Sequence, residues 1–99
     1  MDITAVEGND TVFTCTAKGY PAPTITWYRG VMETDHMELT GAEEPIMMME
    51  GFIVVTSVLT ISPVTRHDSD VYSCVATNRV LGSVRSDMRV FNLTVNCKG

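Results

Sequence analysis

Three consecutive residues, His67, Asp68 and Ser69, supply the base, the carboxylate and the hydroxyl of a nucleophilic triad. Such chemistry needs the imidazole to lie between the carboxylate and the nucleophile, so that it can take the proton from the hydroxyl. Side chains that are neighbours in the sequence cannot stack in that order. We therefore expect no catalytic residue in this segment and predict that the protein is not an enzyme.

Ligands for metal ions and phosphates are equally sparse. Asp35, His36 and Glu38 could touch a divalent ion, but three ligands in one loop make a poor site. The two histidines and three cysteines show none of the short spacings of a zinc site. There is no glycine-rich loop suited to a nucleotide phosphate. We therefore expect no metal ion and no cofactor.

The segments that must position the remaining polar groups have the pattern of β-strands. Apolar and polar residues alternate with a period of two, which places successive side chains on opposite faces. In the segment 11–17, for example, Phe13, Cys15 and Ala17 share one face. About seven or eight strands separated by turns predict an all-β antiparallel sandwich or barrel. We expect strands at 11–17, 24–29 (ended by Gly30), 46–50, 52–61, 71–77 and 84–95, an irregular acidic segment at 31–44 and a hairpin loop at 78–83.

The composition limits the class of protein. The chain has 99 residues, of which 44% are hydrophobic, and this suits one domain with a core over about 3–95. The net charge of −5 makes nucleic acid and anionic membrane surfaces poor partners. No apolar run is long enough to cross a membrane, and the first residues do not form a signal peptide. We therefore expect residues 1–99 to be one domain of a larger multidomain protein, with the export signal and the anchor outside it.

Four separated residues decide between the all-β architectures. Cys15 and Cys74 each fall on the apolar face of an alternating segment, Trp27 lies between them, and Tyr72 precedes the second cysteine by two positions. An inter-sheet disulfide, a tryptophan packed on it and a tyrosine corner characterise immunoglobulin domains. The chain resembles an intermediate-set (I-set) immunoglobulin domain from residue 11 almost to residue 95. The matching residues are Cys15, Ala17, Gly19, Pro21, Pro23, Ile25, Trp27, Leu59, Ile61, Val64, Asp68, Tyr72, Cys74, Ala76, Asn78 and Gly82.

The resemblance implies an immunoglobulin-like two-sheet β-sandwich, in which strands A, B, D and E face strands A′, G, F, C and C′. It implies a disulfide between Cys15 and Cys74 that links the two sheets. It also implies that Trp27 and Leu59 belong to the core around this disulfide. These residues are therefore expected to serve the fold.

The resemblance also assigns roles at one corner of the sandwich. Tyr72 would bury its ring while its hydroxyl bonds to the backbone near Asp68. Asp70 departs from the family pattern, which usually has glycine or alanine at this position. We therefore expect an additional negative charge at this corner.

A small domain that depends on a disulfide belongs outside the cytosol. Two N-glycosylation sequons, at Asn9 and Asn92, agree with that location. Asn9 falls in an expected turn, and Asn92 alternates with the apolar Phe91 and Leu93, so both asparagines should face solvent. We expect an extracellular domain, at the cell surface or secreted, in which a glycan on Asn92 would shield part of its sheet.

Two segments carry residues that could contact a protein partner. Six acidic residues lie between positions 33 and 50 without any lysine or arginine, and three arginines lie in the last hairpin. One interpretation is ordinary solvated surface. The other is a dipolar surface that steers a partner protein, including a second copy of the chain, with methionines as adaptable contacts. The candidate partner-binding residues are Met32, Glu33, Asp35, Met37, Glu38, Arg79, Arg85 and Arg89.

Cys97 is the odd cysteine, two residues beyond the last expected strand. Three roles remain open for it. Its sulfur pairs with a cysteine outside this sequence, bridges two chains, or stays a free thiol.

Two functions remain, and both are implied by the resemblance. The first is a protein-recognition module of a cell-surface adhesion molecule or receptor, beside sister domains in the same chain. The alternative is a structural spacer in an intracellular muscle-type filament protein, which uses the same type of domain. The sequons, Cys97 and the acidic segment favour the first function.

Overall fold

β-Strands make up nearly all of the structure, a computed structural model that describes residues 1–31, 35–43, 47–49, 51–80 and 83–97. One short 3-10 helix, η1 (Arg66–Asp68), precedes the eighth strand. The strands are β1 (Asp2–Val6), β2 (Thr11–Gly19), β3 (Thr24–Val31), β4 (Asp35–Leu39), β5 (Ala42–Glu43), β6 (Met47–Met49), β7 (Phe52–Ile61), β8 (Asp70–Val80) and β9 (Ser83–Asn96).

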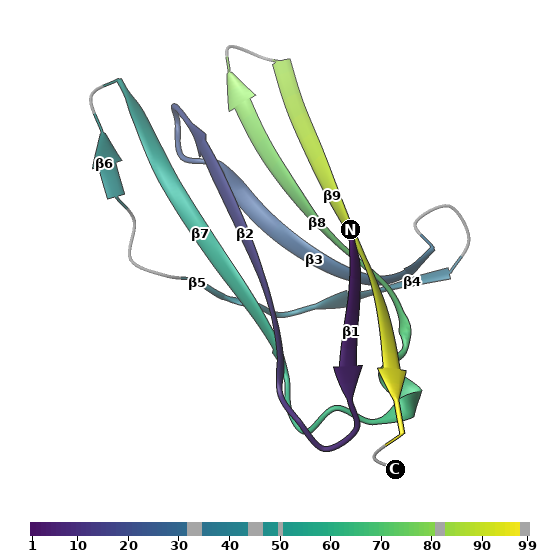
Figure 1. The fold of residues 1–99 in the computed structure, drawn as a ribbon. Coiled ribbons are helices and arrows are strands. Elements are labelled where there is room, and N and C mark those ends of the chain that lie inside the picture. The colour runs from purple at the N-terminus through teal and green to yellow at the C-terminus, as the bar shows by residue number, and fades with distance from the viewer. Residues whose placement is uncertain (32–34, 44–46, 50, 81–82, 98–99) are drawn as a thin grey trace.

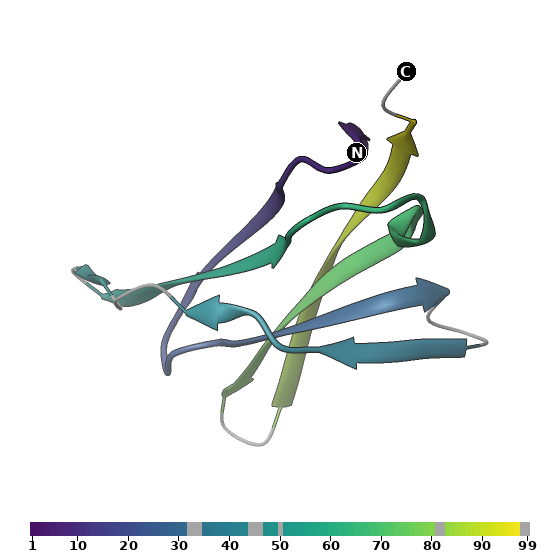
Figure 2. The same ribbon diagram turned by 90° about the horizontal axis from the view of Figure 1, so that it is seen from below.

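The strands form two sheets that face each other (Figure 1, Figure 2). The larger sheet has the order β1-β9-β8-β3-β4, and the smaller has the order β2-β7-β5, with β6 also paired to β7. β1 runs parallel to β9, and the other pairs are antiparallel. The expected all-β two-sheet sandwich is therefore confirmed. The described residues contain an A′ strand, β1, but no strand A, because β1 pairs with β9 alone.

The core lies where the inward-facing rows of the two sheets meet. The ring centroid of Phe13 in β2 lies 5.2 Å from that of Tyr72 in β8 and 5.1 Å from that of Phe91 in β9. Aromatic pairs at this separation add to the free energy gained by burying their area. The buried apolar residues are Phe13, Cys15, Ile25, Trp27, Val55, Leu59, Val64, Tyr72, Cys74, Phe91, Leu93 and Val95.

Trp27 holds the two sheets together at the centre of this core. Its indole is 1% exposed, and Nε1 donates a hydrogen bond of 2.9 Å to Oγ of Ser57 in β7 of the opposite sheet. Gly41 leaves room for the ring, since a Cβ atom there would lie 2.5 Å from Nε1. The disulfide between Cys15 and Cys74 joins β2 to β8 beside it. Closing a loop of this length removes about 4 kcal/mol of denatured-state chain entropy in the loop-entropy account.

The structure corrects several of the expected elements. The segment expected to be irregular contains β4 and β5. Its only apolar alternation, Met37 and Leu39, is short, and ladder hydrogen bonds to β3 and β7 order it. β3 continues through Gly30 to Val31, and Gly30 has a φ of 99° that glycine adopts without strain. β1 was not among the strands expected from alternation, although the resemblance implied an A′ strand. β8 extends to Val80, into the expected hairpin loop. Residues 81 and 82 of that loop, including Gly82, lie outside the described residues.

We predict that Ser57→Ala lowers the free energy of unfolding by about 1–3 kcal/mol, because the buried indole N–H of Trp27 loses its acceptor. Chemical denaturation of the purified chain measures this loss. The matched control is Thr56→Ala, which removes an exposed hydroxyl that lies 3.2 Å from the hydroxyl of Thr16 and should change stability by about 0.5 kcal/mol or less. Equal losses in the two variants would contradict the role given to Ser57.

Candidate functional site

Arg29 organises one corner of the sandwich. Its Nε donates a hydrogen bond of 3.1 Å to Asp70, its Nη1 lies 3.8 Å from Asp68, and its Nη2 donates to the carbonyl of His67. The guanidinium also lies 5.7 Å from the ring centre of Tyr72. The Tyr72 hydroxyl donates a hydrogen bond of 2.6 Å to the carbonyl of Asp68. The charge of Asp70 at this corner is therefore paired with Arg29.

Arg29 was not among the residues expected at this corner. The available signal was alternation, since Arg29 shares the inward face of β3 with Ile25 and Trp27. Burial opposes the charged guanidinium, but the hydrogen bond to Asp70 and the nearby negative charges outweigh burial and raise the pKa of Arg29. Its charge is therefore present at every physiological pH.

Burial also raises the pKa of Tyr72 above its ordinary value of 10.0. The carboxylates of Asp68 and Asp70 act in the same direction, while Arg29 opposes them. The hydroxyl therefore stays protonated at neutral pH and keeps its hydrogen bond to the carbonyl of Asp68.

The residues that resemble a nucleophilic triad hold the backbone at this corner. A carboxylate oxygen of Asp68 accepts a hydrogen bond of 2.7 Å from the N–H of Thr65 at the start of η1. The Ser69 hydroxyl oxygen accepts one of 2.9 Å from the N–H of Val95.

Within the described ranges, no group of three or more His, Cys, Asp or Glu residues could hold a metal ion. No helix in the same ranges has the length and apolar character needed to cross a membrane.

On β9 the buried row ends beside the disulfide. Phe91 of β9 is buried, but the next residue on the same face, Arg89, is exposed and pairs with Cys74 of β8. Asp87 follows on this face, beside Ala76. Charged side chains cannot be buried between two sheets without partners. The sheets therefore diverge at the end where β8 leads into β9, which we call the open end (Figure 1).

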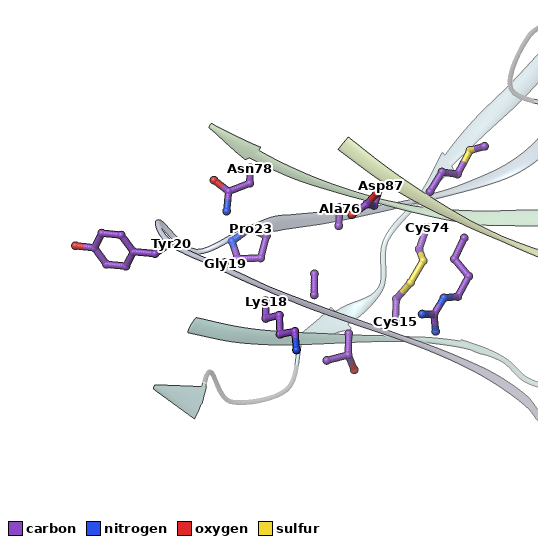
Figure 3. Close-up of a pocket in the computed structure, with 13 residues that line it drawn as sticks. Cys15, Lys18, Gly19, Tyr20, Pro23, Cys74, Ala76, Asn78 and Asp87 are labelled. Atoms are coloured by element: carbon purple, nitrogen blue, oxygen red, sulfur yellow. A yellow bond between two sulfur atoms is a disulfide. The ribbon is translucent and has the colours of Figure 1, made fainter. Parts of the chain in front are cut away.

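A cleft of about 650 Å³ occupies the open end (Figure 3). Ala17 and Gly19 of β2 line it and fill little of the space between the sheets. Nδ2 of Asn78 donates a hydrogen bond of 2.8 Å to the carbonyl of Pro21, while Oδ1 of the same amide is buried with no partner in the described structure. The lining residues are Cys15, Thr16, Ala17, Lys18, Gly19, Tyr20, Pro23, Cys74, Ala76, Asn78, Asp87, Met88 and Arg89.

The candidate partner-binding residues do not form one cluster in the described structure. Glu38 and Met37 are exposed on β4, at one edge of the larger sheet. Arg89 is exposed on β9, near the other edge, and Arg79 is exposed on β8 between them. Asp35 and Arg85 are described only through their backbone pairing, with Val31 and Asn78 respectively. Met32 and Glu33 lie outside the described residues.

The two sequon asparagines lie on the surface. Asn9 is exposed in the turn between β1 and β2, where its backbone N–H donates to the carbonyl of Val6. Asn92 is exposed on the outer face of the larger sheet, and its Nδ2 donates a hydrogen bond of 3.1 Å to Asp2. Cys97 is exposed and free at the end of β9.

Comparison with known proteins identifies the family. A family described as "Immunoglobulin domain" matches residues 1–78 of the chain. The chain belongs to the immunoglobulin domain family. The I-set subtype remains a prediction.

Two relatives of this immunoglobulin domain are much longer proteins. Contactin of Drosophila melanogaster is 33% identical over 85% of the chain, which spans 6% of that protein. Netrin receptor DCC of Homo sapiens is 37% identical over 77% of the chain, which spans 5% of that receptor. The chain is thus similar to a small part of each.

Among solved structures, the crystal structure of Rst D1-D2 superposes with a TM-score of 0.75. It covers 96% of the chain and has 24% sequence identity, and the chain covers 44% of that structure. At this identity the likeness supports the fold alone.

We predict that replacing Tyr72 with phenylalanine alters the alkaline stability of the domain. A pKa raised in the folded state stabilises the fold below the unfolded value of 10.0, and this contribution is lost as the pH rises through the folded pKa. Tyr72→Phe should cost about 1 kcal/mol at neutral pH and show a smaller further loss above pH 10 than the parent chain. Denaturation at a series of pH values measures both effects. Tyr20→Phe, at a ring that is 71% exposed, should behave like the parent, and identical curves for all three proteins would contradict the assignment.

Proposed function

We propose that the chain is an extracellular protein-recognition module of a larger, multidomain cell-surface adhesion molecule or receptor. Its partners are proteins, including a second copy of the chain. The similarity to a part of the netrin receptor DCC supports a receptor context, and the Cys15–Cys74 disulfide supports an oxidising compartment. Because the chain spans only a few per cent of these relatives, sister domains in the same protein belong to the proposal. The surface of the domain carries the proposal, since the fold alone does not specify function.

The outer face of the larger sheet is the observation that carries this proposal. Residues paired across strands share a face, so Thr26, Val75 and Met88 form one row on the side away from the core. Tyr28 and Val90 flank them in the neighbouring row. The Met88 side chain is 57% exposed, and the two valines are half-buried with no element of the described structure over them. An apolar, threonine-rich face of this kind suits a protein contact.

A buried polar atom lies within the same face. Ser73 is 1% exposed between Tyr28 and Val90, and its Oγ has no hydrogen-bond partner in the described residues.

Asn92 is on this face too, one outward position beyond Val90 along β9. A glycan on Asn92 would cover the end of the face near β1. The contact surface that we propose is therefore the half around Thr26, Val75 and Met88.

We predict that Val75→Glu weakens binding to the protein partner by about tenfold or more, because it places a charge at the centre of the apolar row. A multivalent form of the chain is tested against a panel of cell-surface ectodomains of other proteins. The matched control is Val58→Glu, the same change at a half-buried position on the outward-facing side of β7 in the other sheet. Equal binding by the two variants to every ectodomain that the parent recognises would contradict the proposed surface.

We also predict that Asn9 and Asn92 carry glycans in the full-length protein isolated from the surface of its own cells. Both side chains are exposed, and Nδ2 of Asn92 retains one free N–H beside its bond to Asp2. Mass spectrometry of peptides before and after N-glycosidase treatment detects the modification, which Asn9→Gln and Asn92→Gln should each abolish at one site. Unmodified asparagines together with reduced Cys15 and Cys74 would instead identify an intracellular spacer of the muscle-filament type.

A further inference from the structure

Strand β9 has an edge that no described strand occupies. On one side β9 pairs with β8 over residues 83–93. On the other side β1 pairs only with residues 92–96 of β9. The first half of β9, from residue 83 to about residue 90, therefore presents one open side at the boundary of the larger sheet (Figure 1). Open edges of this kind are templates for pairing with another chain.

The backbone hydrogen bonds near β1 show which groups point to this open side. The N–H of Asn92 donates to the carbonyl of Met1 at 2.8 Å, and the carbonyl of Val90 accepts from the Met1 amino group at 3.2 Å. Even-numbered residues of β9 therefore direct their N–H and C=O groups away from β8. The pairing with β8 continues without a bulge to residue 83. The N–H and C=O groups of Val84, Ser86 and Met88 consequently face the open edge.

The charges along this edge alternate in sign. Residues 83–89 read Ser-Val-Arg-Ser-Asp-Met-Arg. Proteins often protect an open edge with charges that repel an incoming strand. Here the two arginines and Asp87 have opposite signs at alternate positions, so the segment is complementary to an antiparallel copy of itself. Such an edge rejects strands of unlike sequence and accepts its own.

We propose that a second copy of the chain pairs antiparallel with β9 at this edge, about a two-fold axis at Ser86. The pairing places Arg85 opposite Asp87 of the second copy, and Asp87 opposite Arg85. It places Val84 opposite Met88 in the same reciprocal way. Ser86 faces its own counterpart, and the even-numbered residues of both copies exchange backbone hydrogen bonds. The two larger sheets then form one continuous sheet, with both smaller sheets on the same side.

Three neighbouring registers of the same pairing fail on charge or on space. An axis at residue 85 places Arg85 opposite itself, and an axis at residue 87 places Asp87 opposite itself. An axis at residue 88 matches the charges but sets residues 83 and 84 of the second copy beside residues 93 and 92. That position is already taken by β1. The axis at Ser86 satisfies both conditions.

The edge stays accessible when the sheet carries its sugar. Asn92 lies six residues along β9 from Ser86, or about 20 Å at the rise of an extended strand. A glycan there projects from the outer face of the sheet and not from the edge of β9. One strand pair buries a small area, so we expect a weak dimer, with a Kd on the order of 100 µM. Arrays of receptors at a membrane strengthen such contacts through multivalency.

This inference deepens the proposed function, on which it rests for its biological setting, by naming one partner as a second copy. Its failure remains distinguishable from the failure of that function. The outer-face contact is tested by Val75→Glu binding and the extracellular location by glycosylation, whereas the edge is tested by self-association alone.

The experiment is sedimentation velocity of the Cys97→Ser chain over a range of concentrations, because this background removes disulfide bridging through Cys97. We expect a reversible dimer that Val75→Glu leaves unchanged. Ser86→Pro should weaken it by about tenfold or more, since proline lacks the N–H that faces the edge and costs no hydrogen bond to β8. Asp87→Arg and Arg85→Asp should each weaken it similarly, because both place like charges opposite each other. The control Glu43→Arg makes the same change in charge on β5 as Asp87→Arg makes on β9, and it should leave the dimer unchanged.

Recombination of the charge variants tests the register itself. A 1:1 mixture of the Asp87→Arg and Arg85→Asp chains should form a heterodimer, because the arginines of one then face the acids of the other. The double variant Arg85→Asp/Asp87→Arg should form a homodimer again. These rescues are observed only with folded chains, so loss of folding cannot imitate them. A parent that stays monomeric, a dimer that survives both Ser86→Pro and Asp87→Arg, or a failure of both rescues would each overturn the proposal.

Discussion

Burial of Trp27 beside the Cys15–Cys74 disulfide is the interaction on which the rest of this structure depends. The indole links the sheets through its hydrogen bond to Ser57, and the disulfide links them covalently between β2 and β8. Together they fix the spacing at the centre of the sandwich. Away from the open end, the aromatic rings fill the space between the sheets, and the corner held by Arg29 closes that end of the sandwich. Toward the open end, the inward-facing row of β9 becomes charged, and the two sheets diverge there.

The same change in the inward-facing row links packing to recognition. While β9 carries Val95, Leu93 and Phe91 inward, it is covered by the smaller sheet on its face and by β1 on its edge. From Arg89 back to Ser86 its side chains are exposed, and from Arg89 back to Ser83 no described strand pairs with its second edge. A strand with its backbone groups exposed and its charges alternating in sign is stable in a soluble domain only if it rejects unrelated strands. The edge of β9 and the apolar outer face next to it are thus the two surfaces that we propose for partners of this immunoglobulin domain.

The sequence predicted the parts of the fold that follow from alternation and from the spacing of a few large residues. The inward positions of Phe91 and Leu93 required only a period of two, and the bounds of β7 required only a run rich in β-branched residues between Gly51 and Pro63. β4 was missed because its alternation, Met37 and Leu39, spans too few residues to distinguish a strand from a loop, and hydrogen bonds to β3 complete its order. Arg29 was missed because an isolated charge on an apolar face has no visible partner until β8 places Asp70 beside it. The open edge of β9 depends on where β1 ends in space, which no local pattern encodes.

The central claim is that a second copy of the chain pairs with β9 at its open edge. Amide hydrogen exchange tests it most directly, resolved by residue in NMR spectra of the Cys97→Ser chain at low and high concentration. Protection at high concentration should appear at the amides of Val84, Ser86 and Met88, whose N–H groups face the open edge. The amides of Asp87 and Arg89 point to β8 and should exchange at the same rate at both concentrations. Unchanged exchange at the three even-numbered positions in a sample that self-associates would contradict the account and locate the contact elsewhere.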